Sequence, residues 1–406
     1  MAVNLHAPTA LLPIAGVQLA TAAAGIKKID RQDVTLLVLD EGVSVAGVFT
    51  RNAFCAAPVV VAQQHLQQTQ PRALIINTGN ANAGTGTVGM AVAHSTCAAV
   101  AAHLGMSATQ ILPFSTGVIG EPKPLDEKIA TVLPALQANL KADNWVAAAH
   151  AIMTTDSVAK GKSAQVTVDG KTISITGICK GAGMIRPDMA TMLAYIATDA
   201  AITPSALQGL LQQMTDGSFN CVTVDGDTST NDACMLMASH RAGNAPLHPQ
   251  HTDWPAFSAA LQDVFLTLAQ AMVRDGEGAT HLIEIAVTGA ADAAEARRVA
   301  DAVAHSPLFK TAAFANDPNW GRILAAVGRA GVSNFDIDAV TVHLNDVCIV
   351  EKGGRASSYT EAQGQAVMDL PEYAVRIHLA RGKAAQTVWT CDFGYEYVKI
   401  NAEYRT

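Results

Sequence analysis

Ala164-Gln-Val-Thr-Val-Asp-Gly-Lys-Thr-Ile-Ser-Ile-Thr-Gly-Ile178 is the stretch of the chain that decides the fold class. It places two runs rich in β-branched residues on either side of the pair Asp169-Gly170, which is a strong short-range signal for a β-hairpin. A glycine-bearing loop follows, and Thr191-Met-Leu-Ala-Tyr-Ile-Ala-Thr198 then returns as a further strand. Hairpin-linked strands are therefore expected in the middle of the chain.

Helices and further strands are expected on both sides of this hairpin. Short apolar runs bounded by turn residues predict strands at 34–39, 73–77, 282–287, 340–344 and 387–400. Longer apolar segments with helix start and stop signals predict helices at 88–104, 125–142, 204–214 and 255–274. Helices and strands in both halves, with hairpins more evident than parallel crossovers, indicate a layered α+β architecture.

The composition describes a folded protein that buries much of its surface. Half of the 406 residues are hydrophobic and only 15% are charged, whereas soluble domains usually carry about 25% charged residues. The surface is therefore expected to be covered within the chain or by copies of it. The net charge of −8 and the absence of Lys and Arg clusters argue against a nucleic-acid partner.

The cysteines and the N-terminal sequence favour a cytoplasmic protein. Seven scattered cysteines contain no C-x-x-C pair, as is typical of small buried residues in a reducing compartment. Residues 7–26 are apolar, but they lack a basic start and are interrupted by Pro8, Pro13 and Gln18, so no signal peptide is predicted. No uninterrupted apolar run is expected to reach membrane-spanning length, and no membrane partner is predicted.

The common motifs of hydrolytic sites do not account for this chain. It has no G-x-S-x-G elbow and no H-E-x-x-H zinc helix. Ser157-Val-Ala-Lys160 matches S-x-x-K, but neither S-D-N nor K-T-G accompanies it, so the match is attributed to chance. A hydroxyl nucleophile can instead use its own α-amine as base, provided that the residue becomes a new N-terminus.

The bond between Ala190 and Thr191 has the chemistry for such a terminus. Attack of the Thr191 hydroxyl on the Ala190 carbonyl would give an ester by N-to-O shift, and hydrolysis would free the α-amine. The small Ala190 leaves its carbonyl accessible, and the glycines before it allow a strained approach. From spacing alone, a threonine that starts a strand is more often structural than catalytic.

Several long segments together resemble the ornithine acetyltransferase family, also called glutamate N-acetyltransferase. The resemblance extends from the N-terminal region to the last residue. The segments are Ser115-Thr-Gly-Val-Ile-Gly120, Lys180-Gly-Ala-Gly-Met-Ile-Arg-Pro-Asp-Met-Ala-Thr-Met-Leu193, Asp225-Gly-Asp-Thr-Ser-Thr-Asn-Asp232, Arg274-Asp-Gly-Glu-Gly-Ala-Thr280, Asn316-Asp-Pro-Asn-Trp-Gly-Arg322 and Ile400-Asn-Ala-Glu-Tyr-Arg-Thr406.

The resemblance implies a role for each matching residue. Thr191 would be the nucleophile of self-cleavage and catalysis, with Ala190 as the last residue of the chain before it. Thr116 and Gly117 would form an oxyanion hole, for which a glycine N–H and a threonine hydroxyl are suitable donors. The substrate-binding positions of the family fall on Thr154, Lys180, Thr191, Glu277, Asn401 and Thr406.

The resemblance also implies the fold, the assembly and the reaction. The expected fold is the αββα-type sandwich of the ornithine acetyltransferase/DmpA-like proteins, cleaved into an α chain (1–190, with the oxyanion hole) and a β chain (191–406), which associate as (αβ)₂. Thr191 would take the acetyl group of N-acetylornithine and pass it to glutamate by a ping-pong mechanism, as in arginine biosynthesis. Some members of the family also accept acetyl-CoA as donor.

Two other hypotheses accompany this one. A related N-terminal-nucleophile aminopeptidase or hydrolase would use water in place of glutamate. A nucleotide-dependent protein would use Gly84-Thr-Gly-Thr-Val-Gly89, which matches G-x-G-x-x-G between a predicted strand and helix. That match lacks the acidic residue which binds ribose, because no Asp or Glu occurs between Glu41 and Glu121.

Neither a metal nor a cofactor is predicted. The 225–232 segment superficially resembles a calcium loop, but Thr230 and Leu236 replace the required glycine and glutamate. It is interpreted as a hydrogen-bonded structural loop. The histidines His248 and His251 have only Asp253 nearby as a further ligand, so a polar surface loop is expected there.

Overall fold

The hairpin expected from residues 164–178 is present in the computed structural model of the chain, which describes residues 2–186 and 192–404. Strand β6 (Lys160–Val168) pairs antiparallel with β7 (Lys171–Lys180), with Val168 opposite Lys171. Asp169 and Gly170 have φ values of 52° and 73°. Positive φ at both central residues is what a two-residue type I′ hairpin requires, so the prediction is confirmed.

The chain divides into two compact units. The first, called here the sandwich unit, comprises residues 6–220 and 227–272, and the second, the six-stranded unit, comprises residues 1–5, 221–226 and 273–406. The predicted boundary between residues 190 and 191 lies inside the sandwich unit. The division into α and β chains stays a prediction, because cleavage of one bond need not separate folded units.

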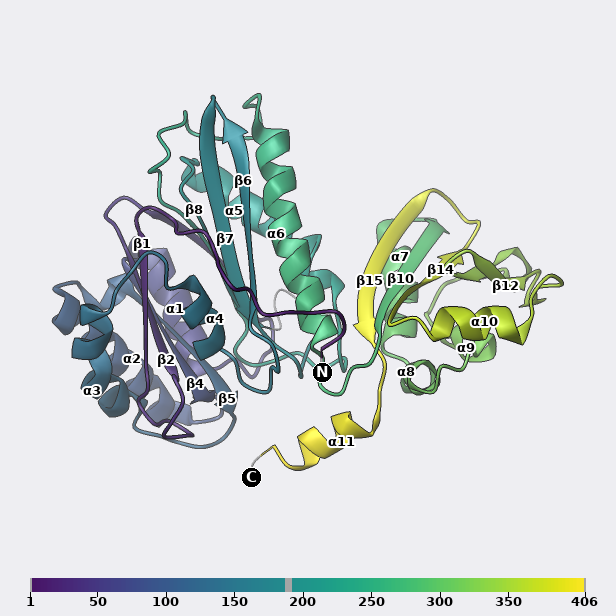
Figure 1. Ribbon diagram of the computed structural model, residues 1–406, viewed down its shortest axis with the longest axis horizontal. Helices are drawn as coiled ribbons and strands as arrows, with labels where there is room; N and C mark the ends of the chain where they lie inside the picture. The colour runs from purple at the N-terminus through teal and green to yellow at the C-terminus, as the bar shows by residue number, and fades with distance from the viewer. Residues whose placement is uncertain (1, 187–191, 405–406) are drawn as a thin grey trace. The chain divides into compact units, whose positions relative to one another are not determined.

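Two sheets form the centre of the sandwich unit (Figure 1). One has the strand order β1-β2-β4-β5 and the other the order β3-β9-β8-β7-β6. Besides β6 and β7, the strands are β1 (Val17–Ala22), β2 (Val34–Leu39), β3 (Ser44–Phe49), β4 (Ala73–Asn80), β5 (Ile111–Val118), β8 (Leu193–Thr198) and β9 (Ala233–Ala238).

Side chains of the two sheets pack face to face. One core cluster joins Leu37, Leu74 and Leu112 of the four-stranded sheet to buried residues of β8 and β9. Phe114 and Tyr195 meet edge to face across this interior, with ring centroids 5.4 Å apart. Because successive residues of a strand point to opposite faces, the neighbours of these leucines point away from the other sheet.

Helices cover the outer faces and complete the αββα layers. Buried residues of α2 and α3 join Leu36, Ile75 and Ile111 in a second core cluster, and α6 packs on β7, where Gly177 lies against Val264 and Leu268. The layered α+β prediction is therefore confirmed. The helices of this unit are α1 (Ala57–Gln68), α2 (Gly86–Leu104), α3 (Leu125–Ala138), α4 (Trp145–Ala151), α5 (Pro204–Asp216) and α6 (Trp254–Arg274).

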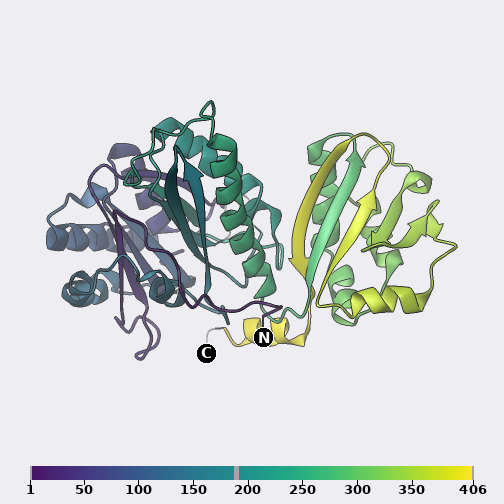
Figure 2. The same cartoon turned by 45° about the horizontal axis from the view of Figure 1, so that its top comes forward.

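The six-stranded unit has a sheet in the order β13-β12-β11-β14-β10-β15, whose strands run side by side in Figures 1 and 2. Its core joins the sheet to α7, α8, α9 and α10. The elements are β10 (Leu282–Ala290), β11 (Thr341–Leu344), β12 (Val347–Glu351), β13 (Gly354–Arg355), β14 (Glu372–His378), β15 (Ala384–Cys391), α7 (Ala293–Ala304), α8 (Pro307–Phe314), α9 (Trp320–Gly328), α10 (Glu361–Met368) and α11 (Tyr395–Ala402).

The predicted strand at 387–400 is wrong in its second half. Strand β15 ends at Cys391, and residues from Tyr395 onward form α11. The apolar residues Val398 and Ile400 imitate the alternation of a strand, but α11 buries none of its residues. Gly394 separates the two elements, and a side chain there would collide with the ring of Phe314.

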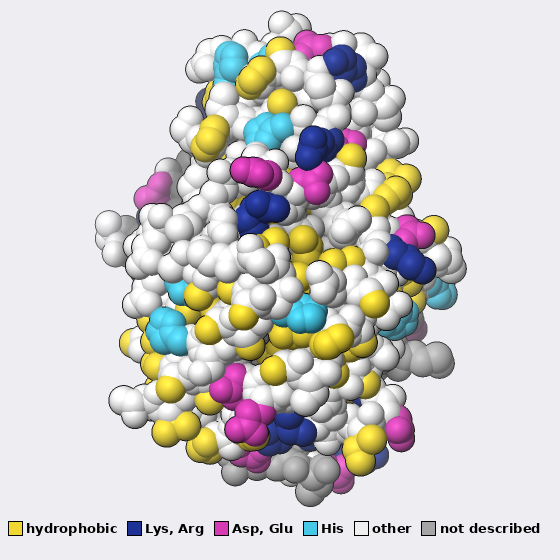
Figure 3. Space-filling model, turned by 90° about the vertical axis from the view of Figure 1, so that its left-hand side faces the viewer, with side chains coloured by type: hydrophobic (Ala, Val, Ile, Leu, Met, Phe, Trp, Pro, Cys, Tyr) yellow, Lys and Arg dark blue, Asp and Glu magenta, His cyan; other side chains and the backbone are white. Residues whose placement is uncertain are grey.

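Among the residues that the structure describes, two helices are long and apolar enough, by length and composition alone, to cross a membrane. They are α2 and α6. In this structure both pack on the sheets of the sandwich unit, as core helices of globular proteins do. On the face drawn in Figure 3, basic and acidic side chains are interspersed among uncharged ones.

Candidate active site

The carboxyl ends of β4 and β5 hold the predicted oxyanion residues. The two strands are parallel, with Thr116 opposite Thr78 and Gly117 opposite Gly79. Gly117 has φ 131°, and a Cβ there would lie against the Gly79 carbonyl carbon and 2.5 Å from the Asn80 nitrogen. Only glycine fits this close approach of two backbones. Carboxyl ends of parallel strands are a common place for ligand sites in α/β sheets.

Lys180 brings the second sheet to the same place. It is the last residue of β7, and its Nζ donates a hydrogen bond of 3.1 Å to Thr116 Oγ1. The Thr116 hydroxyl accepts this bond, so its own proton stays free to be donated elsewhere. Two residues that are 64 positions apart in the chain are thus joined at one point.

Asp156 links Thr154 to the end of β7. The Thr154 N–H donates to Asp156 Oδ2 at 2.9 Å, and the Gly181 N–H donates to Asp156 Oδ1 at 2.7 Å. Lys160 Nζ donates to the same Oδ1 at 2.7 Å, and both side chains of this ion pair are fully buried. Three of the predicted residues, Thr116, Thr154 and Lys180, therefore belong to one connected set of contacts.

Charge keeps Asp156 ionised although it is buried. Burial alone would raise the pKa of this carboxyl, but the ammonium groups of Lys160 and Lys180 and the hydrogen bonds from Lys160 and Thr154 hold it well below its usual range. A buried carboxylate is stable only with such partners. Asp156 is therefore a permanent negative charge beneath the site.

Asp232 is a second buried carboxyl in the same unit with the opposite behaviour. Burial raises its pKa well above the ordinary value, although hydrogen bonds from Ser229 and the charge of Lys180 oppose this shift. Its Oδ2 has no hydrogen-bond partner in the described part of the chain. Asp156 and Asp232 thus hold their protons very differently, which is typical of functional sites.

The segment before Asp232 ties the two sheets together. Asn231 Nδ2 donates to the backbone oxygens of Ala81 and Ser115, at 2.6 and 2.9 Å. Ser115 directly precedes Thr116, so this amide fixes the backbone at the oxyanion residues. The interpretation of this segment as a hydrogen-bonded structural loop is confirmed for this part of it.

Three of the predicted residues, Ala190, Thr191 and Thr406, lie outside the described residues. The described chain resumes at Met192, whose carbonyl accepts a hydrogen bond of 2.9 Å from the Ala233 N–H at the start of β9. Leu193, the first residue of β8, pairs with Lys180. The two ends of the 181–192 segment therefore belong to adjacent, paired strands.

Glu277 and Asn401 come together in the six-stranded unit. Asn401 Nδ2 donates to Glu277 Oε2 at 2.7 Å and to the Tyr397 carbonyl at 2.9 Å, so its amide connects Glu277 to α11. Gly278 follows with φ 74°, and a Cβ there would lie 2.7 Å from the Tyr397 nitrogen. Helix α11 is thus held against the turn at Glu277 by close backbone packing and one side-chain amide.

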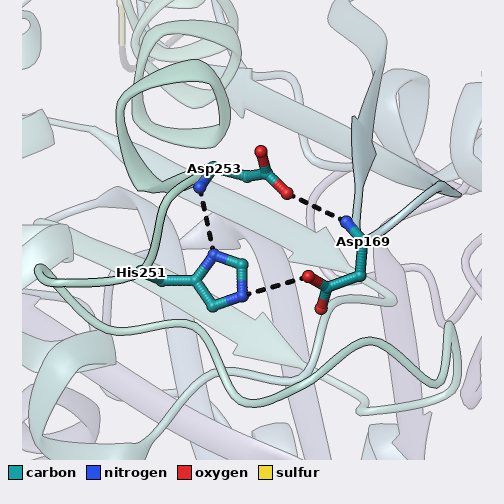
Figure 4. Close-up of side chains that lie close together, drawn as sticks. All are labelled: Asp169, His251 and Asp253. Carbon is teal, nitrogen blue, oxygen red and sulfur yellow. Dashed lines mark hydrogen bonds and ion pairs between the residues drawn. The ribbon is translucent and has the colours of Figure 1, made fainter.

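The histidine loop is a hydrogen-bonded clamp. Asp169, His251 and Asp253 offer three ligand atoms close together (Figure 4). His251 Nδ1 accepts from the Asp253 N–H at 3.1 Å, His251 Nε2 lies 3.3 Å from Asp169 Oδ1, and Asp253 Oδ2 accepts from the Asp169 N–H at 2.9 Å. These atoms hold the tip of the β6–β7 hairpin against the loop before α6, and a metal would have to displace those bonds.

The glycine-rich turn at residues 84–89, on which the nucleotide hypothesis depends, is held by local hydrogen bonds. It joins β4 to α2, as that hypothesis requires. Thr85 Oγ1 donates to Asn82 Oδ1 at 2.8 Å, and Asn82 Nδ2 donates to the Gly89 carbonyl at 3.0 Å. Together with the missing acidic residue, this arrangement favours a structural turn.

At its strand ends this αββα sandwich gathers a hydroxyl, an ammonium group and a glycine backbone, which are the kinds of donor that acyl-transferring enzymes use to stabilise a developing oxyanion. Comparison with known proteins is more specific. The ArgJ family model matches residues 18–406, nearly the whole chain. The chain belongs to the ArgJ family.

Individual relatives agree with this assignment. The arginine biosynthesis bifunctional protein ArgJ of Pseudomonas syringae pv. tomato is 55% identical over 411 aligned residues, which cover 100% of both chains. The protein of the same name from Methylococcus capsulatus is 55% identical over 396 residues, or 98% of this chain and 97% of that one. This chain is accordingly an acetyltransferase of arginine biosynthesis.

Solved structures are similar over part of the chain. The arginine biosynthesis bifunctional protein of Bacillus halodurans is 40% identical, with a TM-score of 0.49 over 51% of this chain and 97% of that one. The ornithine acetyltransferase of Mycobacterium tuberculosis, solved in complex with ornithine, is 35% identical, with a TM-score of 0.38 over 44% of this chain and 94% of that one.

Sequence reasoning missed Asp156, Lys160 and Asp232. Asp156 stands two residues after the predicted Thr154, but a lone aspartate in a loop carries no signal of burial. Lys160 was visible only in the S-x-x-K match that was attributed to chance. A hydrogen-bonded cluster built from segments far apart in sequence becomes visible only in the folded chain.

Proposed function

We propose that the protein transfers the acetyl group of N²-acetyl-L-ornithine to L-glutamate through an acetyl ester on Thr191. Family membership supports the reaction, and the Mycobacterium tuberculosis relative binds ornithine. The contact between Lys180 and Thr116 carries the proposal for the site, because it joins a candidate carboxylate-binding ammonium to a candidate oxyanion donor at 3.1 Å.

Self-cleavage prepares the nucleophile. The Thr191 hydroxyl attacks the Ala190 carbonyl, the peptide nitrogen leaves with a proton, and water hydrolyses the resulting ester. The products are an α chain of residues 1–190 and a β chain of residues 191–406. The freed α-amine, with an ordinary pKa of about 7.7–8.0, is the base that activates the hydroxyl next to it.

Acetyl transfer uses the same atoms twice. The Thr191 hydroxyl attacks the acetyl carbonyl of the donor, and ornithine leaves with the proton held by the α-amine. The amine of glutamate then attacks the ester and releases the hydroxyl. In both tetrahedral intermediates the Thr116 hydroxyl and the Gly117 N–H stabilise the oxyanion. The ammonium of Lys180 polarises the Thr116 hydroxyl and makes it a stronger donor.

Substrate recognition uses the remaining candidate residues. Lys180 binds the α-carboxylate as a point charge, and Glu277 binds an amine. Thr154, Asn401 and Thr406 add polar contacts. Acetyl-CoA is the second candidate donor. A cytoplasmic (αβ)₂ assembly of the two chains completes the proposal.

The test begins with the intact mass of purified protein under denaturing conditions. Two species, residues 1–190 and 191–406, are expected for the wild type, and one full-length, inactive species is expected for Thr191→Ala. Cleavage after Ala190 in that variant, or full activity of an uncleaved wild type, would exclude the mechanism. A Ser163→Ala variant, changed in strand β6 of the same sheet, serves as the matched control and should be cleaved normally.

Product assays then separate the reactions. Formation of N-acetylglutamate from N-acetylornithine should require glutamate, whereas a hydrolase or aminopeptidase would release acetate or amino acids without it. Replacing the donor by acetyl-CoA tests the second activity. Sedimentation of the cleaved protein should give twice the mass of the uncleaved 406-residue chain. A stable particle with the mass of one α chain plus one β chain would contradict the (αβ)₂ assembly.

A further inference from the structure

Asp156 holds two chain segments that carry candidate substrate residues. Its Oδ2 accepts from the Thr154 N–H at 2.9 Å, in the loop after α4, and its Oδ1 accepts from the Gly181 N–H at 2.7 Å, directly after Lys180. The side chain of this aspartate is fully buried. One carboxylate therefore sets the distance between the segment of Thr154 and the segment of Lys180.

The negative charge of Asp156 strengthens this arrangement. A hydrogen bond from a backbone N–H to an ionised carboxylate is about twice as strong as one to a neutral oxygen. Lys160 neutralises the buried charge at 2.7 Å, so the carboxylate can stay ionised without binding a substrate group. Lys180 also contributes to keeping Asp156 ionised, which couples this carboxylate to the proposed binding cation.

The chain after Gly181 leaves the sheet under a tight constraint. Gly181 has φ 151°, and a Cβ there would lie 2.9 Å from Ile185 Cδ1 and 3.2 Å from Met272 Sδ. The last pair of the ladder is Lys180 with Leu193. The bond to Asp156 thus fixes the first amide beyond the ladder, where the segment that contains the proposed cleavage bond begins.

We propose that Asp156 is a positioning residue for both self-cleavage and substrate binding, acting through the Thr154 and Gly181 amides and through Lys180. The inference rests on the proposed function. Lys160 is the counter-ion that allows this carboxylate to remain buried and charged. In this proposal Asp156 acts through these groups and not by its own contact with substrate or the reacting atoms.

The test removes the charge of the Asp156 side chain and keeps its shape. Asp156→Asn loses the charge and turns one acceptor into an N–H donor, which cannot accept from a backbone amide. Self-cleavage, followed by intact mass over time, should slow by about 100-fold, the effect expected when a reacting group is displaced by about 1 Å. In the cleaved fraction, KM for N-acetylornithine should rise by about tenfold, as for the loss of one charge-assisted hydrogen bond.

A double variant separates positioning from general destabilisation. If Asp156 acts through Lys180, the effects of Asp156→Asn and Lys180→Met on KM should not multiply, because the second change removes what the first displaces. Fully multiplying effects would overturn the action through Lys180, and wild-type cleavage and KM in Asp156→Asn would overturn the inference as a whole. Asp156→Glu, which keeps the charge but shifts the oxygens, decides the matter if Asp156→Asn does not fold: slow cleavage supports the inference and wild-type cleavage overturns it.

Asp199→Asn is the matched control. Asp199 also accepts a backbone bond from β7, at 2.8 Å from the Ser174 N–H, but it follows the far end of β8. That end lies about 17 Å from Leu193 along the strand. The control should keep wild-type cleavage and KM. Failure of the wild type to make N-acetylglutamate would instead contradict the proposed function, whatever Asp156→Asn does.

Discussion

The two groups of candidate residues are held by different kinds of structure. In the sandwich unit, Thr116 and Lys180 stand at strand ends above a fully buried ion pair between Asp156 and Lys160. In the six-stranded unit, Asn401 belongs to α11, a helix of eight residues that buries none of them. A buried charged network loses function and stability together when it is changed, whereas an exposed helix can lose a contact without loss of folding.

The difference between the groups suggests a division of labour. Groups that act on the reacting carbonyl must keep their geometry within a fraction of an ångström. Groups that recognise the far end of two different substrates tolerate more movement. The rigid group is therefore the one proposed for the chemistry and for binding the α-carboxylate, and the group that includes α11 is the one proposed for recognition of the amine.

The largest effect is expected for Gly117→Ala, which would break the rigid group. The new Cβ would meet the backbone of Gly79 and Asn80 at a φ of 131°. We expect a fall in kcat of about 10²–10³-fold, as for the loss of one oxyanion donor, and a loss of about 1–3 kcal/mol of unfolding free energy from strain. Gly120→Ala is the control, since it has positive φ but open space around its Cβ position.

Steady-state kinetics and denaturant unfolding check this prediction. An unchanged kcat in Gly117→Ala would show that Gly117 is not part of the oxyanion hole. An equal fall in Gly120→Ala would show that positive φ, rather than the close backbone approach, decides the outcome.

A smaller effect, confined to binding, is expected for Asn401→Ala in the six-stranded unit. It removes the 2.7 Å bond to Glu277, so KM should rise by about tenfold, the equivalent of about 1.4 kcal/mol. The melting temperature should stay within about 1 °C of the wild type, since exposed positions contribute little to stability. Val398 lies on the same helix and is 67% exposed. The control variant Val398→Ala should therefore change neither KM nor the melting temperature.

Initial rates over a range of donor concentrations, with thermal unfolding of the same samples, check this prediction. A large drop in melting temperature would show that α11 is as tightly coupled to its unit as the buried ion pair is, and the contrast between the two groups would disappear.

The smallest effect is expected for Asp232→Asn and concerns the dependence of stability on pH. The pKa of Asp232 is raised in the folded state, so the folded chain binds this proton more tightly than the unfolded one. Its contribution to stability is therefore complete below the unfolded pKa, about 3.9, and falls as pH rises through the folded pKa. In the variant, stability should no longer decrease with rising pH on account of this group. The variant should therefore unfold at a slightly higher temperature than the parent at neutral pH.

The comparison is made in a Thr191→Ala background, so that the covalent state is the same throughout. Asp156→Asn should show the opposite sign, because the pKa of Asp156 is lowered on folding and its stabilising contribution is present at neutral pH. A destabilised Asp232→Asn at neutral pH would show that this carboxylate, in its charged form, stabilises the fold.

The sequence predicted the layers better than the contacts between them. The hairpin at Asp169-Gly170 follows from local turn chemistry, and its strands were placed within a few residues of β6 and β7. The end of the chain was misread, because the alternation of Val398 and Ile400 is shared by strands and short exposed helices. Sequence pattern therefore predicts an element reliably where neighbouring residues alone determine its backbone conformation, as in the hairpin turn.

The candidate site depends on contacts that are distant in sequence. Thr116 and Lys180 were named through the family resemblance, and no rule of spacing brings them together. The pairing of Asp156 with Gly181 depends on how the loop after α4 meets the end of β7. The burial that makes this carboxylate notable is a property of the packed sheets, so it could not be seen along the chain.

The strand order of the five-stranded sheet bears on the order in which folding and the proposed cleavage occur. In the order β3-β9-β8-β7-β6, the two strands that come from residues 191–406 lie between strands that come from residues 1–190. Neither fragment could complete this sheet alone, so two separately encoded halves would each reach the cell with missing neighbours and exposed strand edges. If the proposed cleavage between residues 190 and 191 occurs, the strand order therefore predicts that the five-stranded sheet forms in the intact chain before the bond is cut.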